Sequence, residues 1–287
     1  MIYTKYFLFT LLLAVSLELQ AQTFGVRAGL NNGTLQGPTE NSSEEFGFNG
    51  GFHFGVNYGY NVSDLLSIMV EVGYTQYGTR QSYNGDSYFI IRDDERTIWE
   101  RGNREMELSI SNGYLSFPVV VNYKLTKKWE IFAGAYANIL VSPTGRGQLR
   151  FTSEDNPDDI IFVQSLDYNY RNDMALEGRR ITGQRDIGVF DENGEVIFFP
   201  KIAGAYYQHS EKAANLINGL DAGLVTGFNY FLNKGFYAGL RVEYGLTDVT
   251  DDRVDASLAE LDAQNSLIYR DDKDHHLGIN VSIGFRF

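Results

Sequence analysis

The chain has 287 residues, no cysteine, and 24 Lys and Arg against 37 Asp and Glu, which gives a formal net charge of −13. This negative charge argues against nucleic acid as a partner, because a phosphate backbone needs a basic face. The lack of cysteine argues against a disulfide framework, a thiolate metal site, a cysteine nucleophile and a lipid-modified N-terminus, and 19 Tyr, 20 Phe and 30 Gly are too many for a disordered acidic chain.

Residues 1–21 have the pattern of a secretory signal peptide. Lys5 supplies the positive charge, an apolar run follows over 6–15, and the small Ala21 marks the expected cleavage point. An N-terminal membrane anchor is the alternative, but the apolar run is short for a membrane span. The mature chain, 22–287, has no other apolar run of helical spanning length, so it is either secreted or crosses a membrane as strands.

The rest of the chain favours a period of two residues, which is the period of a β-strand. In the last segment, Leu277, Ile279 and Val281 alternate with Gly278 and Asn280. Eight segments with this pattern are expected at residues 24–31, 46–60, 66–74, 115–125, 129–141, 220–232, 236–246 and 277–287.

The connections between these segments alternate in length. The long ones are residues 32–45, 80–107, 143–218 and 248–274, and the short ones are residues 61–64, 126–128 and 233–235. Short turns at one rim and long loops at the other are typical of outer-membrane barrels, with both termini at the periplasmic rim.

The two faces of the segments differ in bulk. One face is crowded with Leu, Val, Ile, Phe and Tyr, whereas the other holds mainly Gly, Asn and Ser. A soluble sandwich also alternates, but the lean face here suits a narrow barrel interior and the bulky face suits lipid. We therefore predict an all-β fold: a transmembrane antiparallel up-and-down β-barrel of eight strands in the outer membrane, with long extracellular loops.

Several pieces resemble the PorT-like outer-membrane β-barrel family of Bacteroidota, whose members are often labelled "porin family". They are Thr-Phe-Gly-Val-Arg-Ala-Gly-Leu-Asn at 23–31, Tyr-Leu-Ser-Phe-Pro-Val-Val-Val-Asn-Tyr at 114–123, Tyr-Gly-Leu-Thr-Asp at 244–248 and the terminal Phe287. The resemblance covers strands and short turns but not the third long loop. It implies an outer-membrane location and insertion by the barrel-assembly machinery, with Phe287 as the assembly signal. It implies no shared activity, although one member class helps protein secretion.

Charged residues on the lean face would lie inside the barrel. An interior polar network is expected from Arg27, His53, Glu71, Arg241, Glu243 and Arg286. An eight-stranded interior is just wide enough for side chains, and buried charges must pair, so we expect this network to plug the barrel. The alternative is an ion or proton pathway.

The third long loop, 143–218, is expected to be extracellular and to contain a hairpin. Residues 187–190 and 196–199 are good strand formers, and Asp-Glu-Asn-Gly at 191–194 is a strong hairpin turn. The hairpin would stand above the membrane or fold over the barrel mouth. The alternative is two more membrane strands, which would make ten.

The acidic fourth loop offers weak candidates for chemistry. Asp274 and His276 resemble the acid–imidazole pair of outer-membrane omptin proteases, although omptins use ten strands. No calcium-loop spacing, Gly-rich phosphate loop, nucleophile elbow or zinc spacing occurs, so no metal, cofactor or enzymatic activity is expected. Residues 256–261 are expected to form a short helical turn.

The favoured function is a non-catalytic outer-membrane protein that binds a partner or ligand through surface loops or supports envelope assembly or secretion. A small pore or transporter is the alternative, and a loop-borne hydrolase is a distant one. The expected partners are outer-membrane lipid, the barrel-assembly machinery and an extracellular or envelope partner that the sequence does not identify. Aromatic girdles are expected from Tyr58, Tyr60, Trp129 and Phe236 at one membrane surface and from Tyr74 and Tyr77 at the other.

Overall fold

The computed structural model describes residues 22–92, 97–155, 158, 160–175, 186–190 and 193–287. The expected signal peptide, 1–21, lies outside these residues. Within the described part of the chain, no helix is both long enough and apolar enough to cross a membrane.

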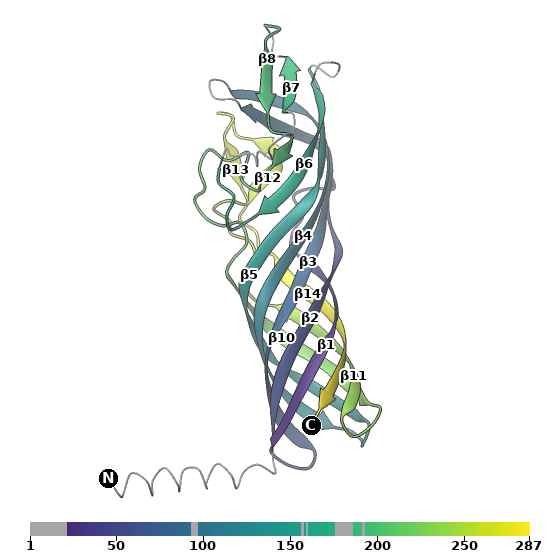
Figure 1. Ribbon diagram of the computed structural model, residues 1–287. Coiled ribbons are helices and arrows are strands. Elements are labelled where there is room, and N and C mark those ends of the chain that lie inside the picture. Colours follow the sequence, from purple (N-terminus) through teal and green to yellow (C-terminus); the bar gives the residue numbers. More distant parts are fainter. Residues whose placement is uncertain (1–21, 93–96, 156–157, 159, 176–185, 191–192) are drawn as a thin grey trace, which may run out of the picture.

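Eight strands close into a ring in which every pair of neighbours is antiparallel (Figure 1). They are β1 (Gln22–Gln36), β2 (Glu44–Asn61), β3 (Leu66–Arg92), β4 (Thr97–Lys124), β5 (Trp129–Ser153), β10 (Leu220–Phe231), β11 (Phe236–Gly245) and β14 (His275–Arg286). Each strand pairs with the next in this order, including β5 with β10, and β14 pairs with β1 to complete the ring. The predicted eight-stranded up-and-down barrel is confirmed.

The lower part of the ring is apolar outside and small or polar inside. Each strand exposes a large apolar or aromatic side chain in this outer belt, such as Leu30, Phe54, Val70, Val119, Ile139, Leu224, Tyr244 and Ile283. The interior is narrow: a Cβ atom added to Gly29 would lie 2.0 Å from the Val281 carbonyl oxygen and 2.7 Å from the His53 ring. Larger residues have no room there, because the backbone of β14 and the His53 side chain already occupy the space.

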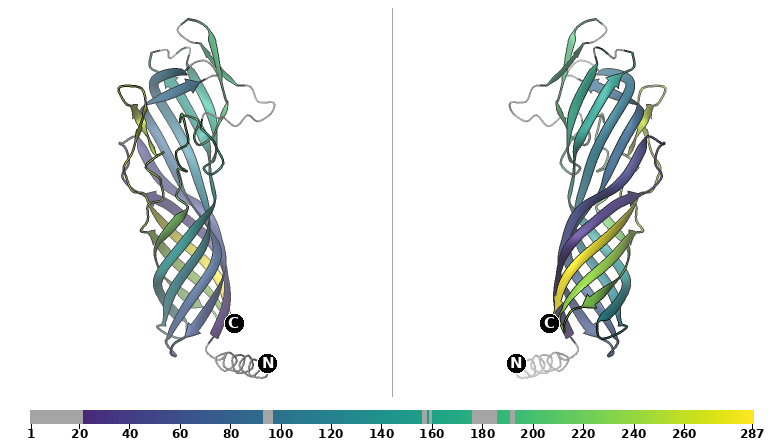
Figure 2. Two further views of the ribbon diagram at one scale, coloured as in Figure 1. Left: turned by 90° about the vertical axis from the view of Figure 1, so that its left-hand side faces the viewer. Right: turned by 90° about the vertical axis from the view of Figure 1, so that its right-hand side faces the viewer.

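The three short turns and the C-terminus lie at one rim (Figure 2). Backbone hydrogen bonds close the turns, for example from Val62 N to Leu66 O at 2.9 Å. Phe287 follows β14 directly, and its N–H donates to the Phe24 carbonyl at 2.7 Å. β1 begins at the same rim, where Gln22 pairs with Tyr60 beside the first short turn.

The prediction of a long loop at 80–107 is wrong, because most of these residues lie in strands. β3 continues to Arg92 and β4 begins at Thr97, and the two stay in register from Gly73 opposite Ser116 up to Arg92 opposite Thr97. Beyond the apolar belt the polarity of the sheet reverses: inner side chains become apolar and outer ones become charged. Because charged residues replace apolar ones on the outer face, the alternation of the lower strands is lost and the sequence pattern resembles a loop.

A bulge makes this reversal possible in β5. Gly113 pairs with Ser142 but Tyr114 pairs with Leu140, so one residue of β5 is unpaired. Below the bulge Ile139 is exposed on the outer face, whereas above it another odd-numbered residue, Phe151, is fully buried on the inner face. Because successive side chains of a strand point to opposite faces, one extra residue turns every side chain beyond it to the other face of the sheet.

In its described residues, the third long loop adds strands to the sheet above the belt and none to the ring. β6 (Ile161–Asn169) pairs with the upper part of β5, and β9 (Ile202–Ala203) runs parallel to β6. β7 (Ile187–Phe190) and β8 (Val196–Phe199) form an antiparallel hairpin over the two segments that the sequence indicates. Its turn lies partly outside the described residues. The ten-strand alternative is therefore wrong.

The fourth long loop forms a second small hairpin and not the expected helical turn. β12 (Ala256–Leu261) pairs with β13 (Leu267–Tyr269). The extended backbone of β12 is held from both sides: the Leu258 N–H donates to Glu40 Oε2 at 2.7 Å, and the Ser257 carbonyl accepts from the Tyr88 hydroxyl at 2.8 Å. We call the described part of the molecule beyond the apolar belt the head (Figures 1 and 2); it comprises residues 34–48, 76–92, 97–113, 142–155, 158, 160–175, 186–190, 193–218 and 247–274.

Candidate functional site

Four of the six expected interior residues join in one network inside the barrel. Arg27 on β1 donates from Nε to Glu71 Oε2 on β3 at 2.7 Å. Arg241 on β11 lies 3.4 Å from Glu71 Oε2 and 3.4 Å from Glu243 Oε1. Each of these four side chains is at least nine-tenths buried, so two positive and two negative charges balance within the lumen.

Tyr77 extends the network to β14, which the sequence did not anticipate. Its hydroxyl donates to Glu243 and accepts from Asn280 Nδ2, the latter at 2.8 Å. The expectation that Tyr77 belongs to an aromatic girdle is wrong, because its odd position in β3 puts it on the same inner face as Glu71. The sequence already shows that Tyr77 and Glu71 lie an even number of positions apart and so share a strand face.

The remaining two expected residues lie elsewhere in the lumen. His53 is hydrogen-bonded to Asn31 rather than to the charged network. Arg286 pairs with Glu130 near the short-turn rim, with two nitrogen–oxygen distances of 2.9 Å.

The network leaves little open space in the lumen. A cavity beside Arg27, Met69, Phe132 and Arg241 has a volume of about 10 Å³. That is at the lower limit of what one water molecule needs. The lower barrel is therefore a filled structure and not an open channel at this level.

A larger cavity, of about 150 Å³, lies in the head. Its walls are mainly apolar and come from the inner face of the extended sheet and from the two long loops. Phe89, Met106, Leu108, Leu149 and Leu166 contribute to it. Concave apolar sites with a few polar groups are the usual form of small-molecule sites.

The polar groups in this cavity are buried and incompletely bonded. Arg104 is 3% exposed and donates from Nη2 to the Tyr88 carbonyl at 2.6 Å, while its Nε has no hydrogen-bond partner. His209 Nδ1 and the Tyr170 hydroxyl are also buried without a partner. Burial lowers the pKa of His209 to about 4, so this ring is neutral at pH 7. Arg104 was not among the residues expected from the sequence, although it alternates with Met106 and Leu108 on one strand face.

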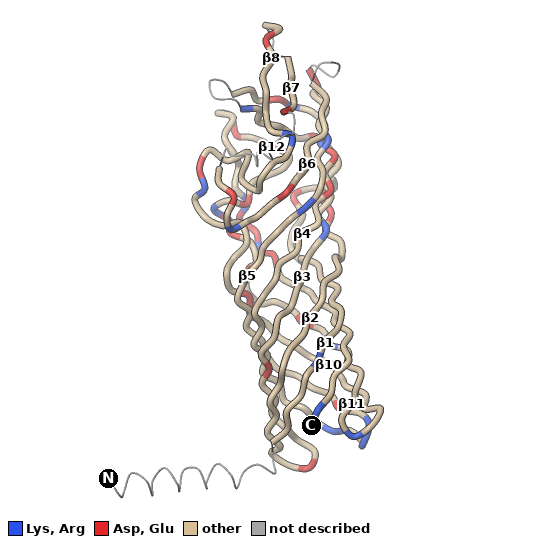
Figure 3. Tube along the Cα trace, viewed as in Figure 1, with Lys and Arg blue, Asp and Glu red and all other residues tan. Residues whose placement is uncertain are grey.

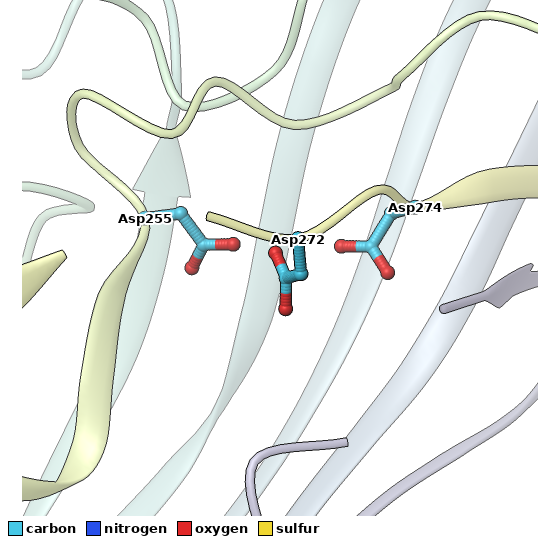
Figure 4. A group of neighbouring side chains, drawn as sticks. All are labelled: Asp255, Asp272 and Asp274. Carbon is cyan, nitrogen blue, oxygen red and sulfur yellow. The ribbon is translucent and has the colours of Figure 1, made fainter. Parts of the chain in front are cut away.

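Three carboxylates of the fourth loop, Asp255, Asp272 and Asp274, lie close together (Figure 4), and Asp255 and Asp274 line the cavity. One carboxylate oxygen of each lies within 4.8 Å of the others, a spacing that could hold a cation. Arg270 already contacts Asp272, and it also lies 3.2 Å from Glu44. Burial and the neighbouring carboxylates raise the pKa of Asp255 to about 7 and that of Asp274 to about 6.

We expect the head to lose stability as the pH rises. Both carboxyls bind protons more tightly in the folded state than at their ordinary pKa of 3.8, so their contribution is complete below about pH 4 and is lost as the pH passes 6 to 7. The temperature at which the head becomes sensitive to protease should therefore be lower at pH 8 than at pH 5. Asp255→Asn should flatten this dependence and the exposed control Asp271→Asn should not; an unchanged dependence in Asp255→Asn would contradict the assignment.

The expected Asp274–His276 pair is not formed. Asp274 accepts from the Thr250 hydroxyl at 3.1 Å. His276 Nδ1 lies 3.6 Å from Asp221 Oδ2, and its ring packs edge-on against Tyr77. The two side chains therefore have separate partners.

The sequence matches a known protein family. The profile described as "Outer membrane protein beta-barrel domain" matches residues 20–251, which is most of the chain. The chain belongs to this family. It is an outer-membrane β-barrel. Charged residues accordingly concentrate in the head and near the short-turn rim (Figure 3).

This outer-membrane barrel is similar to several solved structures at low sequence identity. Ail, the attachment invasion locus protein of Yersinia pestis, is 8% identical over 92% of this chain and 98% of that chain, with a TM-score of 0.35. Neisserial surface protein A is 10% identical over 92% and 97%, with a TM-score of 0.34. OprG from Pseudomonas aeruginosa is 8% identical over 93% and 96%, with a TM-score of 0.33. No curated protein matches the chain.

Proposed function

We propose that this protein is a non-catalytic surface receptor, in which a plugged barrel anchors a head that binds a ligand or partner outside the cell. The observation that carries the proposal is the contrast between the two cavities. The lumen holds about 10 Å³ beside its charged network, whereas the head holds about 150 Å³ with buried, unpaired polar groups. Such a protein needs no cofactor.

We also infer how the protein is oriented in the outer membrane. Residues 1–21 are removed as a signal peptide, the barrel-assembly machinery inserts the chain through Phe287, and both mature termini face the periplasm. The acidic head then points outward. Short periplasmic turns and long extracellular loops are the common arrangement in such barrels. The PorT-like resemblance of 23–31 and 114–123 supports the same orientation and leaves a role in envelope assembly or secretion compatible with a binding head.

Conductance separates this proposal from a small pore. The purified protein in planar bilayers is expected to show no steady conductance, because Arg27, Glu71, Arg241 and Glu243 bridge the lumen. A porin inserted in the same bilayers serves as the positive control. Steady, large conductance of the wild-type protein would favour the pore and overturn the role of the barrel as a plugged anchor.

A further inference from the structure

Arg104 in the head differs from the buried arginines of the barrel in its partners. In the membrane barrel, Arg27, Arg241 and Arg286 each contact a glutamate. Arg104 is just as buried, but among the described residues no carboxylate forms an ion pair with it. Its contacts are the Tyr88 carbonyl and the Tyr88 ring, whose centroid lies 5.6 Å from the guanidinium carbon.

A buried, unpaired guanidinium is costly because an arginine cannot shed its proton in a protein. Burial lowers the pKa of Arg104, with Tyr88 opposing this in part, but the side chain remains a cation. Its Nε is left without a hydrogen-bond acceptor. An anion in the adjoining cavity would neutralise the buried charge and accept a hydrogen bond from Nε. Hydrogen bonds between a guanidinium group and an anion are among the strongest in proteins.

The cavity also limits what that anion can be. Its volume of about 150 Å³ resembles that of an apolar protein cavity that takes up benzene. Its walls include Leu108, Leu149 and Leu166, which favour an apolar body. Asp255 and Asp274 line the same cavity and would repel a second negative charge.

We propose that the head cavity binds a compact amphipathic carboxylate, with one negative charge held by Arg104 and an apolar body about the size of one aromatic ring. The inference rests on the proposed binding function of the head. The free Tyr170 hydroxyl and the neutral His209 ring supply further hydrogen-bonding groups inside the cavity. A phosphate dianion fits the site poorly, because Arg270, the other arginine that lines the cavity, already pairs with Glu44 and Asp272.

Calorimetry on the full mature chain in detergent tests this with benzoate and its neutral analogue benzamide. Benzoate should bind at least about tenfold more tightly than benzamide. Arg104→Met should abolish that preference, whereas Arg101→Met, an exposed residue on the same strand, should keep it. Equal binding of both probes, or binding of neither to folded wild-type protein, would overturn the assignment of the ligand.

Stability without ligand separates a binding role from a structural one. Arg104→Met keeps the length of the side chain and removes an unpaired buried charge, so the melting temperature of the ligand-free head should stay unchanged or rise. A lower melting temperature would show that Arg104 holds the head together, and the proposal would fail. Failure with benzoate in a protein that still does not conduct would reject this ligand class and leave the proposed binding function standing.

Discussion

Replacing Glu71 by alanine is expected to destabilise the barrel by about 3–5 kcal/mol, the usual cost of breaking a buried ion pair from one side. Glu71 contacts both Arg27 and Arg241 in the lumen. Without it, one more positive charge than negative remains in the network, and Arg27 loses its carboxylate partner. Urea unfolding in detergent micelles, followed by the difference in gel mobility between folded and unfolded barrel, measures the change.

The double variant Glu71→Ala/Arg27→Ala is the informative control. It removes one charge of each sign and leaves Arg241 beside Glu243, 3.4 Å apart, so it should be less destabilised than Glu71→Ala alone. Arg253→Ala, which breaks an exposed pair with Asp251, should change little. If Glu71→Ala unfolds at the wild-type urea concentration, the lumen network does not hold the barrel together.

Replacing Phe89 by alanine is expected to unfold the head while leaving the barrel intact. Phe89 is 1% exposed and packs against Phe151, Phe162 and Phe199, with ring centroids 5.6, 4.8 and 5.8 Å away. Truncating such a residue costs about 3–5 kcal/mol through lost burial and the cavity left behind. Protease should then digest the head at temperatures where the wild-type head resists.

The control for this experiment lies on the same part of the molecule. Phe198 on β8 is 60% exposed, so Phe198→Ala should leave the protease resistance of the head unchanged. The barrel of the Phe89→Ala variant should keep the gel mobility of a folded barrel, since its lumen network is untouched. Loss of that mobility together with the head would show that the two parts fold as one unit, contrary to our expectation.

The sequence by itself determined the barrel. Alternation of apolar and small residues, together with the alternation of long and short connections, predicted eight strands and their short turns. It also put Arg27, Glu71, Arg241 and Glu243 on the inner face, because in a strand every second residue shares a face. Local patterns were sufficient there, since lipid imposes one polarity rule on every membrane strand.

Only the tertiary structure decided what happens above the membrane. There water replaces lipid, the rule of polarity reverses, and the outer charges of β3 and β4 no longer distinguish a strand from a loop. The bulge in β5 opposite Gly113 and the course of the third loop decide which side chains meet. Arg104 and His209 are far apart in sequence and line one cavity because of long-range packing, which no local period encodes.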